Sequence, residues 1–173
     1  MNFSGKEVFF DRDDLIVSKT DPTGRIIYAN HTFLEVADYT EEEVIGKQHN
    51  VIRYPAMPRA IFELLWTSIK AGEEIFAYVV NSTKHGDHYW VIAHVTPSIK
   101  NGTIVGFHST RRVPNATTIQ NVIIPLYDEL KAIEDSCASK KDGLQKSVDA
   151  LKAKLAEKGV SYAEFIANLS KDD

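Results

Sequence analysis

The chain has 173 residues, 20 basic and 24 acidic side chains, a net charge of −4, and a hydrophobic fraction of 43%. That length suits one domain of about 100 to 130 residues plus an appended segment, and a balanced charge without a Lys/Arg block argues against nucleic acid as a partner. No run of about 18 apolar residues and no secretory core occur, so we expect a cytoplasmic protein that does not insert into a membrane.

The first half of the chain predicts a hairpin followed by short helices. Residues 15–20 and 25–30 are β-rich, and the Pro and Gly between them are typical of a tight turn. Asn30 or Thr32 can cap a short helix. Thr40 followed three residues later by Glu43 is a capping box, which predicts another.

A longer helix and three more strands follow. Pro58 stands where the first turn of a helix tolerates proline, and apolar residues then recur at helical spacing to about residue 70. Strands are expected at residues 75–82, 88–98 and 103–112, with glycine in each connecting turn. The sequence therefore predicts an α+β fold, a five-stranded antiparallel sheet with short helices on one face.

The last part of the chain is expected to be purely helical. One apolar stripe begins at Ile119 and contains Pro125, which predicts a kink or break. A second stripe begins at Leu144, Gly159 ends its helix, and Ser161 caps a last one. The expected organisation is an N-terminal cap at 1–14, a sensor domain at 15–113 and a C-terminal α-helical tail at 114–173.

The motifs of common catalytic and metal sites are missing. There is no glycine-rich phosphate loop, no HExxH and no serine in a nucleophile elbow, and a single cysteine cannot build a multi-cysteine metal site. His85 and His88 flank a turn glycine, so we expect no metal site there. His94 and His108 lie on predicted strands, where an inward imidazole suits either a core residue or a haem ligand. We expect a protein that is not an enzyme.

A proline-bounded segment at residues 47–66 is the best candidate for a ligand site. Arg53 can hold a phosphate or carboxylate in a bidentate manner, and Tyr54 adds a ring and a hydroxyl. Asn50 and Asn81 offer amides for a heteroaromatic edge. Apolar walls can come from Phe62, Trp66, Phe76 and Tyr78. Together these residues suit a flat, partly charged ligand such as a nucleotide cofactor.

The chain resembles a PAS domain. The resemblance rests on DPTGRIIYAN at residues 21–30 and GDHYWV at residues 86–91. HNVIRYPAMP at residues 49–58, with Trp66 after it, is similar to the branch found in bacterial aerotaxis receptors of the Aer type and in CetB-like energy-taxis proteins. The similarity covers about residues 15–113 and continues weakly through PLY at residues 125–127.

That resemblance implies non-covalent binding of FAD, with Arg53 at the charged or adenine-bearing part and Asn81 at the isoalloxazine edge. In two places the chain departs from the family pattern. Arg-His-Pro-Asp reads Arg53-Tyr54-Pro55-Ala56 here, and Ile75 stands where a tryptophan is common. The implied cofactor-binding residues are Asn30, Asn50, Arg53, Tyr54, Phe62, Trp66, Ile75 and Asn81.

By the same resemblance the protein would sense redox state or oxygen for an aerotaxis or energy-taxis pathway. It would act through a separate chemoreceptor-type protein, with the tail serving dimerisation or partner docking. The alternatives are a cofactor-free PAS adaptor that dimerises through its tail, a haem-binding PAS gas sensor using His94, His108 or another histidine, and a flavin-dependent enzyme.

Overall fold

The computed structural model describes residue 1 and residues 3–172, which form two compact units. The sheet unit comprises Phe3–Pro55 and Ser68–Val113, and the helical unit contains Ala56–Thr67 and the chain from Pro114 onward. The segment Ala56–Thr67, which we expected inside the sensor domain, thus groups with the helical unit. The three-part organisation at 1–14, 15–113 and 114–173 stays a prediction.

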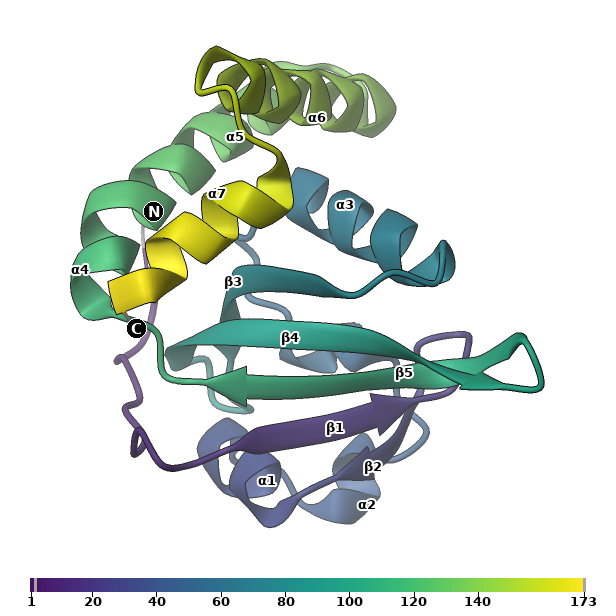
Figure 1. Cartoon of the computed structure of the whole chain (residues 1–173). Helices are drawn as coiled ribbons and strands as arrows, with labels where there is room; N and C mark the ends of the chain where they lie inside the picture. The colour runs from purple at the N-terminus through teal and green to yellow at the C-terminus, as the bar shows by residue number, and fades with distance from the viewer. Residues whose placement is uncertain (2, 173) are drawn as a thin grey trace. The chain divides into compact units, whose positions relative to one another are not determined.

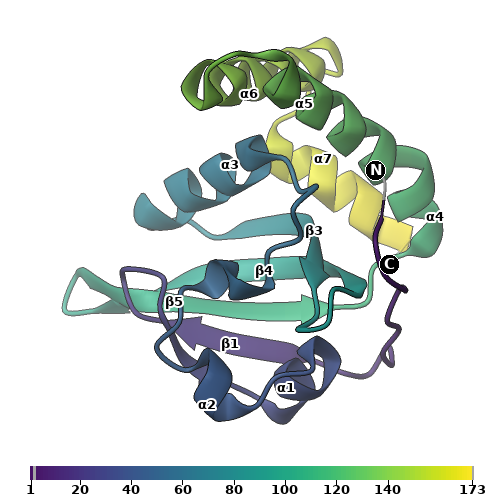
Figure 2. The same cartoon turned by 180° about the vertical axis from the view of Figure 1, so that it is seen from behind.

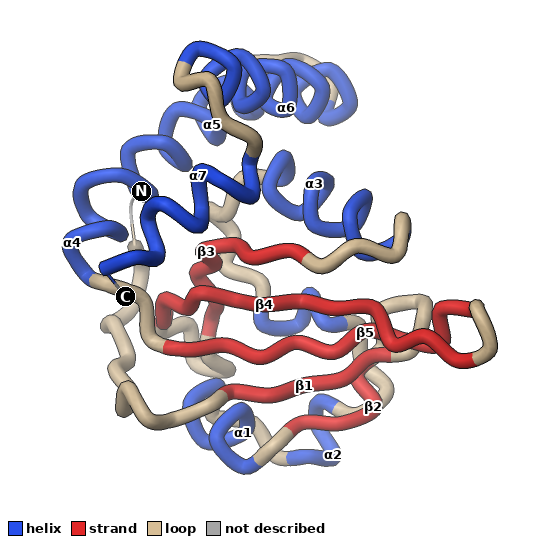
Figure 3. Tube along the Cα trace, in the orientation of Figure 1, coloured by secondary structure: helices blue, strands red, loops and turns tan. Residues whose placement is uncertain are grey.

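The sheet unit is built on five antiparallel strands in the order β2-β1-β5-β4-β3 (Figures 1 and 3). The two N-terminal strands lie at one edge, and the three-strand meander completes the sheet. Expectation and structure agree in strand number and order along the chain. The bounds are Ile16–Thr20 (β1), Ile26–Ala29 (β2), Ile75–Ser82 (β3), His88–Lys100 (β4) and Thr103–Arg112 (β5).

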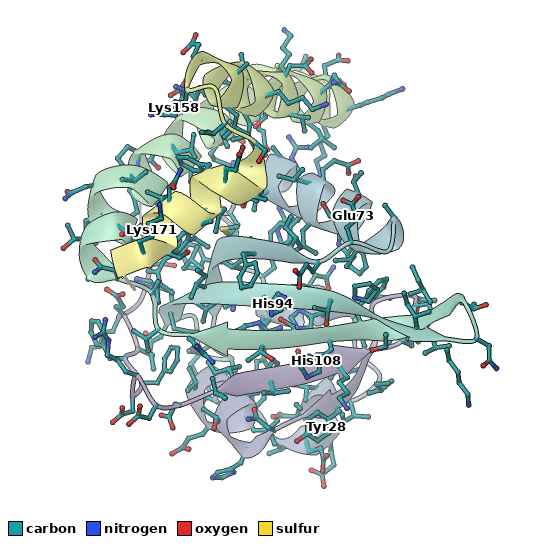
Figure 4. All side chains as sticks on the ribbon, in the orientation of Figure 1. Tyr28, Glu73, His94, His108, Lys158 and Lys171 are labelled. Atoms are coloured by element: carbon teal, nitrogen blue, oxygen red, sulfur yellow. The ribbon has the colours of Figure 1, made fainter. Side chains whose placement is uncertain are left out.

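The strands alternate between two faces, as the period of two requires. We call the buried side the inner face; on β1 it carries Ile16, Ser18 and Thr20. Because Ser18 pairs with Ser109 and Ile16 with Arg111, both β5 residues lie on the same face. The opposite, outer face is more exposed, and Tyr28, His94 and His108 lie on it, turned toward the viewer in Figure 4.

Short helices connect β2 to the rest of the sheet, and α1 and α2 lie in front of the strands when the molecule is seen from behind (Figure 2). Asn30 caps the first of them, and Thr40 with Glu43 forms the predicted capping box of the second. The fold is therefore the expected α+β sheet with short helices. Their bounds are His31–Ala37 (α1), Glu41–Val44 (α2) and His49–Ile52 (η1, a 3₁₀ helix).

The helical unit begins with most of α3 (Arg59–Lys70) and continues with the tail. Pro125 falls in the first turn of α5, directly after a π-helical turn. The backbone stays helical from α4 through η2 into α5, so the helix is not broken at Pro125, and the proline is accommodated where the hydrogen-bonding pattern changes. No helix of the described residues is long and apolar enough to cross a bilayer. The tail elements are Ala116–Thr118 (α4), Ile119–Ile123 (η2), Ile124–Ser136 (α5), Lys140–Glu157 (α6), Tyr162–Leu169 (α7) and Ser170–Asp172 (η3).

An ion pair between the half-buried Arg59 and the buried Glu134 ties α3 to the tail within the helical unit. The Arg59 Nε donates to Glu134 at 3.0 Å, and the backbone N–H of Ala60 donates to the other carboxylate oxygen at 3.0 Å. Gly143 of α6 lies so close that a Cβ there would meet the Glu134 carbonyl oxygen at 2.6 Å. The Glu134 carboxylate is therefore fully engaged, and it also satisfies one of the free N–H groups at the start of α3.

Candidate functional site

Buried polar atoms without a partner gather on the inner face of the sheet unit. Among the described residues, Arg111 Nη1, Asn81 Nδ2 and the Tyr89 hydroxyl make no hydrogen bond, nor do the hydroxyls of Thr20 and Ser109. Most buried polar groups in proteins are hydrogen-bonded, so five on one sheet face require an explanation. The inner face of the sheet is therefore the candidate site.

Arg111 is the most demanding of these groups, because its side chain is charged and the residue is only 4% exposed. One nitrogen, Nη2, donates to Ser18 Oγ at 2.9 Å and to His49 Nε2 at 2.6 Å. Its guanidinium carbon also lies 5.7 Å from the centre of the Phe33 ring. No carboxylate pairs with Arg111 among the residues described.

Burial shifts the pKa values of this group. Desolvation lowers the pKa of Arg111 to about 10, so the guanidinium is still charged at neutral pH. Desolvation, with the nearby charge of Arg111 as the second cause, lowers the pKa of His49 to about 3. The imidazole is therefore neutral and keeps Nε2 as an acceptor for Arg111. Burial raises the pKa of Tyr89, so its hydroxyl stays protonated.

Asn81 is placed beside this cluster by sheet register. It pairs with Tyr89 across β3 and β4, so the two side chains share the inner face. An isolated antiparallel bridge joins the backbone of Asn81 to Arg53, which caps the C-terminal end of η1. The structure thus brings two predicted residues, Arg53 and Asn81, together. Arg53 is half-buried and Asn81 is 4% exposed.

The two other predicted asparagines have different surroundings. The Asn30 carboxamide is already engaged: its oxygen accepts from the N–H groups of Val17 and Phe33, and its nitrogen donates to the Leu15 carbonyl. It ties α1 to β1 and has little left to offer a ligand. The side chain of Asn50 is exposed on η1.

Tyr54 is buried, and it contacts the N-terminal segment. Its hydroxyl accepts from the Ser4 N–H at 2.8 Å, and its ring packs beside those of Phe3 and His88, with centroid distances of 5.5 and 5.7 Å. Phe3 itself stacks on His88 at 4.4 Å. Tyr54, which stands where the resemblance led us to expect a histidine, thus holds the N-terminal segment against the end of β4.

The remaining predicted residues are apolar. Ile75 begins β3 on the inner face, opposite Val95, and is 6% exposed. Phe62 and Trp66 lie on α3 within the helical unit, where both are half-buried. The assignment of all eight residues to a cofactor remains a prediction.

His94 and His108 face away from the candidate site. Both lie on the outer face, where the His94 imidazole stacks on Phe76 at 4.1 Å and lies 2.7 Å from the Glu74 carboxylate. Neither of these two imidazoles can therefore be the axial ligand of a haem on the inner face. No three His, Cys, Asp or Glu side chains of the described chain are grouped to hold a metal ion.

Sequence reasoning missed Arg111, Tyr89, Ser18 and the part played by His49. A signal for one of them was present: strand alternation in GFHSTRR at residues 106–112 puts Phe107, Ser109 and Arg111 on a single face. A strand with one apolar face would not carry a serine and an arginine there without a polar partner. The role of His49 depends on the position of η1 and could not be read from spacing.

Comparison with known proteins agrees with this architecture. Residues 26–111 match the family model described as the PAS fold. The chain is 40% identical over 120 residues to the aerotaxis receptor of Escherichia coli K12, an alignment that covers 69% of this chain and 24% of the receptor. It is 28% identical over 87 residues to Phototropin-2 of Oryza sativa subsp. japonica, covering 50% of this chain and 10% of that protein. The chain thus spans about a quarter or less of the length of these relatives.

Solved structures share the fold at low identity. The dark structure of the blue-light photoreceptor Aureochrome1 LOV superposes with a TM-score of 0.58 at 18% identity, covering 66% of this chain and 86% of that one. The LOV domain of the Erythrobacter litoralis EL346 blue-light activated histidine kinase gives a TM-score of 0.52 at 18% identity, covering 56% and 93%. At this identity the likeness concerns the fold alone.

Proposed function

The chain belongs to the PAS family, with a domain of the aerotaxis-receptor type at residues 26–111, and we propose that it is a flavin-binding sensor. It binds FAD non-covalently and reports redox state or oxygen to a chemotaxis-type pathway. The observation that carries this proposal is the set of buried, unpartnered polar atoms on the inner face of the sheet.

These atoms suit the edge of a flavin ring. An isoalloxazine presents carbonyl oxygens and ring nitrogens that accept hydrogen bonds, and the unpartnered nitrogens of Arg111 and Asn81 are both donors. The Tyr89 hydroxyl, protonated because burial raises its pKa, donates or accepts. When bound, the flavin supplies reversible electron uptake. The chain's own residues hold the ring edge and replace the water that would otherwise solvate it.

The similarity to the aerotaxis receptor supports a sensory role rather than catalysis, and no residue of the site is assigned a catalytic step. The protein would act in the cytoplasm as a homodimer and pass its state to a separate chemoreceptor-type protein. The tail is the proposed docking element, because α5 and α6 pack on each other through small residues. Gly143 is one; Ser147, whose Oγ donates to the Leu130 carbonyl at 3.2 Å, is another.

The test is the flavin content of the full chain. Protein expressed in a flavin-supplied host should carry a flavin chromophore that is released as free FAD on denaturation. Asn81→Ala should lower the affinity for FAD by about tenfold, and with it the flavin content at limiting FAD, since it removes one buried hydrogen bond to the ring. Asn121→Ala, on an exposed residue of η2, is the matched control and should leave occupancy unchanged.

A protein that stays colourless when supplied with FAD would refute the proposal. That result would favour the alternative function, a PAS adaptor without a cofactor. Analytical ultracentrifugation of the full chain would then show whether it dimerises.

A further inference from the structure

The segment from α1 through α2, residues 31–45, covers part of the inner face (Figure 2), and we call it the flap. Its first helix places the Phe33 ring 5.7 Å from the guanidinium carbon of Arg111. The residues between its two helices bring Tyr39 near Tyr89, whose pKa is raised mainly by burial and further by Tyr39. Arg111 and Tyr89 of the candidate site therefore lie behind the flap.

Both ends of the flap are anchored to the sheet by hydrogen bonds. At the start, the Asn30 side chain accepts from the Val17 N–H at 2.9 Å and donates to the Leu15 carbonyl at 2.7 Å. At the end, the Gly46 N–H donates to the Ile26 carbonyl of β2 at 2.8 Å. The two ends are thus fixed to strands β1 and β2, and the part of the flap between them is held separately.

The middle of the flap is held by two exposed ion pairs. Lys84 Nζ donates to Glu43 Oε1 at 2.5 Å, and this hydrogen bond lowers the pKa of Glu43 and raises that of Lys84. His85 Nε2 lies 3.2 Å from Asp38 Oδ2, an ion pair when the imidazole is protonated. Both cations come from the turn between β3 and β4, and we call the two pairs the latch.

The turn that carries the latch is firmly held, whereas the flap is built from weak elements. The Thr83 N–H donates to the Asp87 carbonyl at 2.8 Å, and the Asp87 carboxylate accepts from the Lys6 N–H at 2.7 Å. The helices of the flap have seven and four residues, too short to be stable alone. Between them Asp38 has a φ of 58°, which is uncommon for a residue other than glycine. The flap is therefore the part that moves when the latch opens.

We propose that the latch is a gate for the ligand: when its two ion pairs break, the flap opens and the flavin enters or leaves. This inference rests on the proposed flavin function. Exposed ion pairs contribute little to stability, so the latch can open often while the domain stays folded. The latch is closed in the empty and in the loaded protein. Weakening it therefore speeds entry and exit by the same factor and leaves the affinity unchanged.

The test uses a latch variant, Lys84→Met with His85→Gln, in the full chain. Methionine keeps an unbranched side chain without the charge, and glutamine does not titrate. The matched control is Lys154→Met, which removes an ion pair of similar exposure in the helical unit. Lys154 and its partner Glu129 have side chains that are 37% and 49% exposed, against 38% for both Lys84 and Glu43.

Hydrogen exchange without added flavin tests the latch by itself. The N–H of residue 84 reports opening, because it donates to the Ala37 carbonyl of the flap at 2.9 Å. After correction for the intrinsic rate, it should exchange about 2- to 25-fold faster in the latch variant, the combined effect of two exposed ion pairs. The N–H groups of Asn30 and Gly46, at the two anchors, should keep their wild-type rates, and the control variant should change none of the three.

Stopped-flow mixing of the apoprotein with FAD, and displacement of bound FAD, then test the gate. Association and dissociation should both be faster in the latch variant, by the same factor of about 2 to 25, with the dissociation constant unchanged. A residue that contacts the flavin or shapes its site would change the dissociation constant instead. The control variant should have wild-type rates.

Salt provides a readout that needs no substitution. The screening length falls from about 10 Å at 0.1 M to about 3 Å at 1 M ionic strength, which weakens exposed ion pairs. Both flavin rates of the wild type should therefore rise between these two salt concentrations. The latch variant has lost both pairs, so its rates should rise less.

The outcomes separate the gate from the proposed function. A changed dissociation constant with only one rate altered would overturn the inference, because the latch would then act on the bound state. Unchanged exchange at residue 84 would overturn it, and so would faster exchange with unchanged flavin rates, since the flavin would then use another path. In each of these cases the proposed function would stand. Failure of the wild-type chain to bind FAD would overturn the proposed function and this inference together.

Discussion

His49 makes stability depend on pH in a way that tests the geometry of the inner face. The imidazole accepts from Arg111 at 2.6 Å, and burial next to that charge lowers its pKa to about 3. An unfolded chain has an ordinary histidine pKa of about 6.5. As the pH falls through about 6.5 the unfolded state therefore takes up a proton that the folded state does not, and the folded state loses relative stability.

The size of this loss follows from linkage. The stabilisation is fully present above the unfolded pKa and declines between about pH 6.5 and pH 3, by up to about 1.4 kcal/mol per pH unit. Lowering the pH from about 8 to about 5 should thus decrease the free energy of unfolding by at most about 2 kcal/mol through His49 alone. This is an upper limit, because the residue as a whole is only half-buried.

Urea unfolding of the wild type and of His49→Gln at both pH values measures the effect. The glutamine amide oxygen can still accept from Arg111 but does not titrate, so the pH-dependent loss should be smaller in the variant by about 2 kcal/mol. Asn121→Ala, at an exposed residue that does not titrate, is the control and should keep the wild-type dependence. Burial and nearby cations also lower the pKa of His108, which contributes with the same sign in every variant.

Equal pH dependence in wild type and His49→Gln would refute the reasoning. It would mean that the imidazole takes up a proton in the folded chain as readily as in the unfolded one, which its acceptor role toward Arg111 forbids.

Two further predictions concern contacts away from the site. Glu134→Ala should lower the free energy of unfolding by about 3 to 5 kcal/mol in chemical denaturation, because it removes the buried carboxylate that pairs with Arg59. Glu129→Ala, the control, removes a half-exposed partner of Lys154 and should cost less than about 1 kcal/mol. Gly5→Ala should release the N-terminal segment to limited proteolysis, because a Cβ would lie 2.4 Å from the Gly86 carbonyl oxygen. Gly159→Ala, which has a positive φ as well but open space around it, should not do so.

The fold could be predicted from the sequence because its signals are local. Alternating strands, turn glycines and the two capping boxes depend on residues within a few positions of one another, and the structure has each of them. The grouping of Ala56–Thr67 with the tail could not be read in this way. It involves contacts between distant parts of the chain, such as the pairing of Arg59 with Glu134, which are 75 residues apart.

The site was harder to predict, because burial and strand register decide which polar side chains are left without a hydrogen-bond partner. Asn81 was identified from its residue type, yet its lack of a partner only appears once Tyr89 is placed opposite it. Asn30 looks the same in sequence, but the folded chain uses its amide for a helix cap. Residue type alone thus cannot distinguish a ligand contact from a structural one, whereas the count of satisfied hydrogen bonds can.

Glu134 and Arg111, the buried charged groups among the residues that the structure describes, show what such a count means. In the helical unit, Glu134 receives hydrogen bonds from an arginine and from a backbone N–H. In the sheet unit, Arg111 has no carboxylate partner within the described part of the chain, and one of its nitrogens finds no acceptor there. Both positions are subject to the same desolvation penalty, so selection for stability alone would have satisfied or removed the second charge as it satisfied the first. The incomplete hydrogen bonding of Arg111 therefore agrees with the proposal that a ligand supplies the missing acceptor.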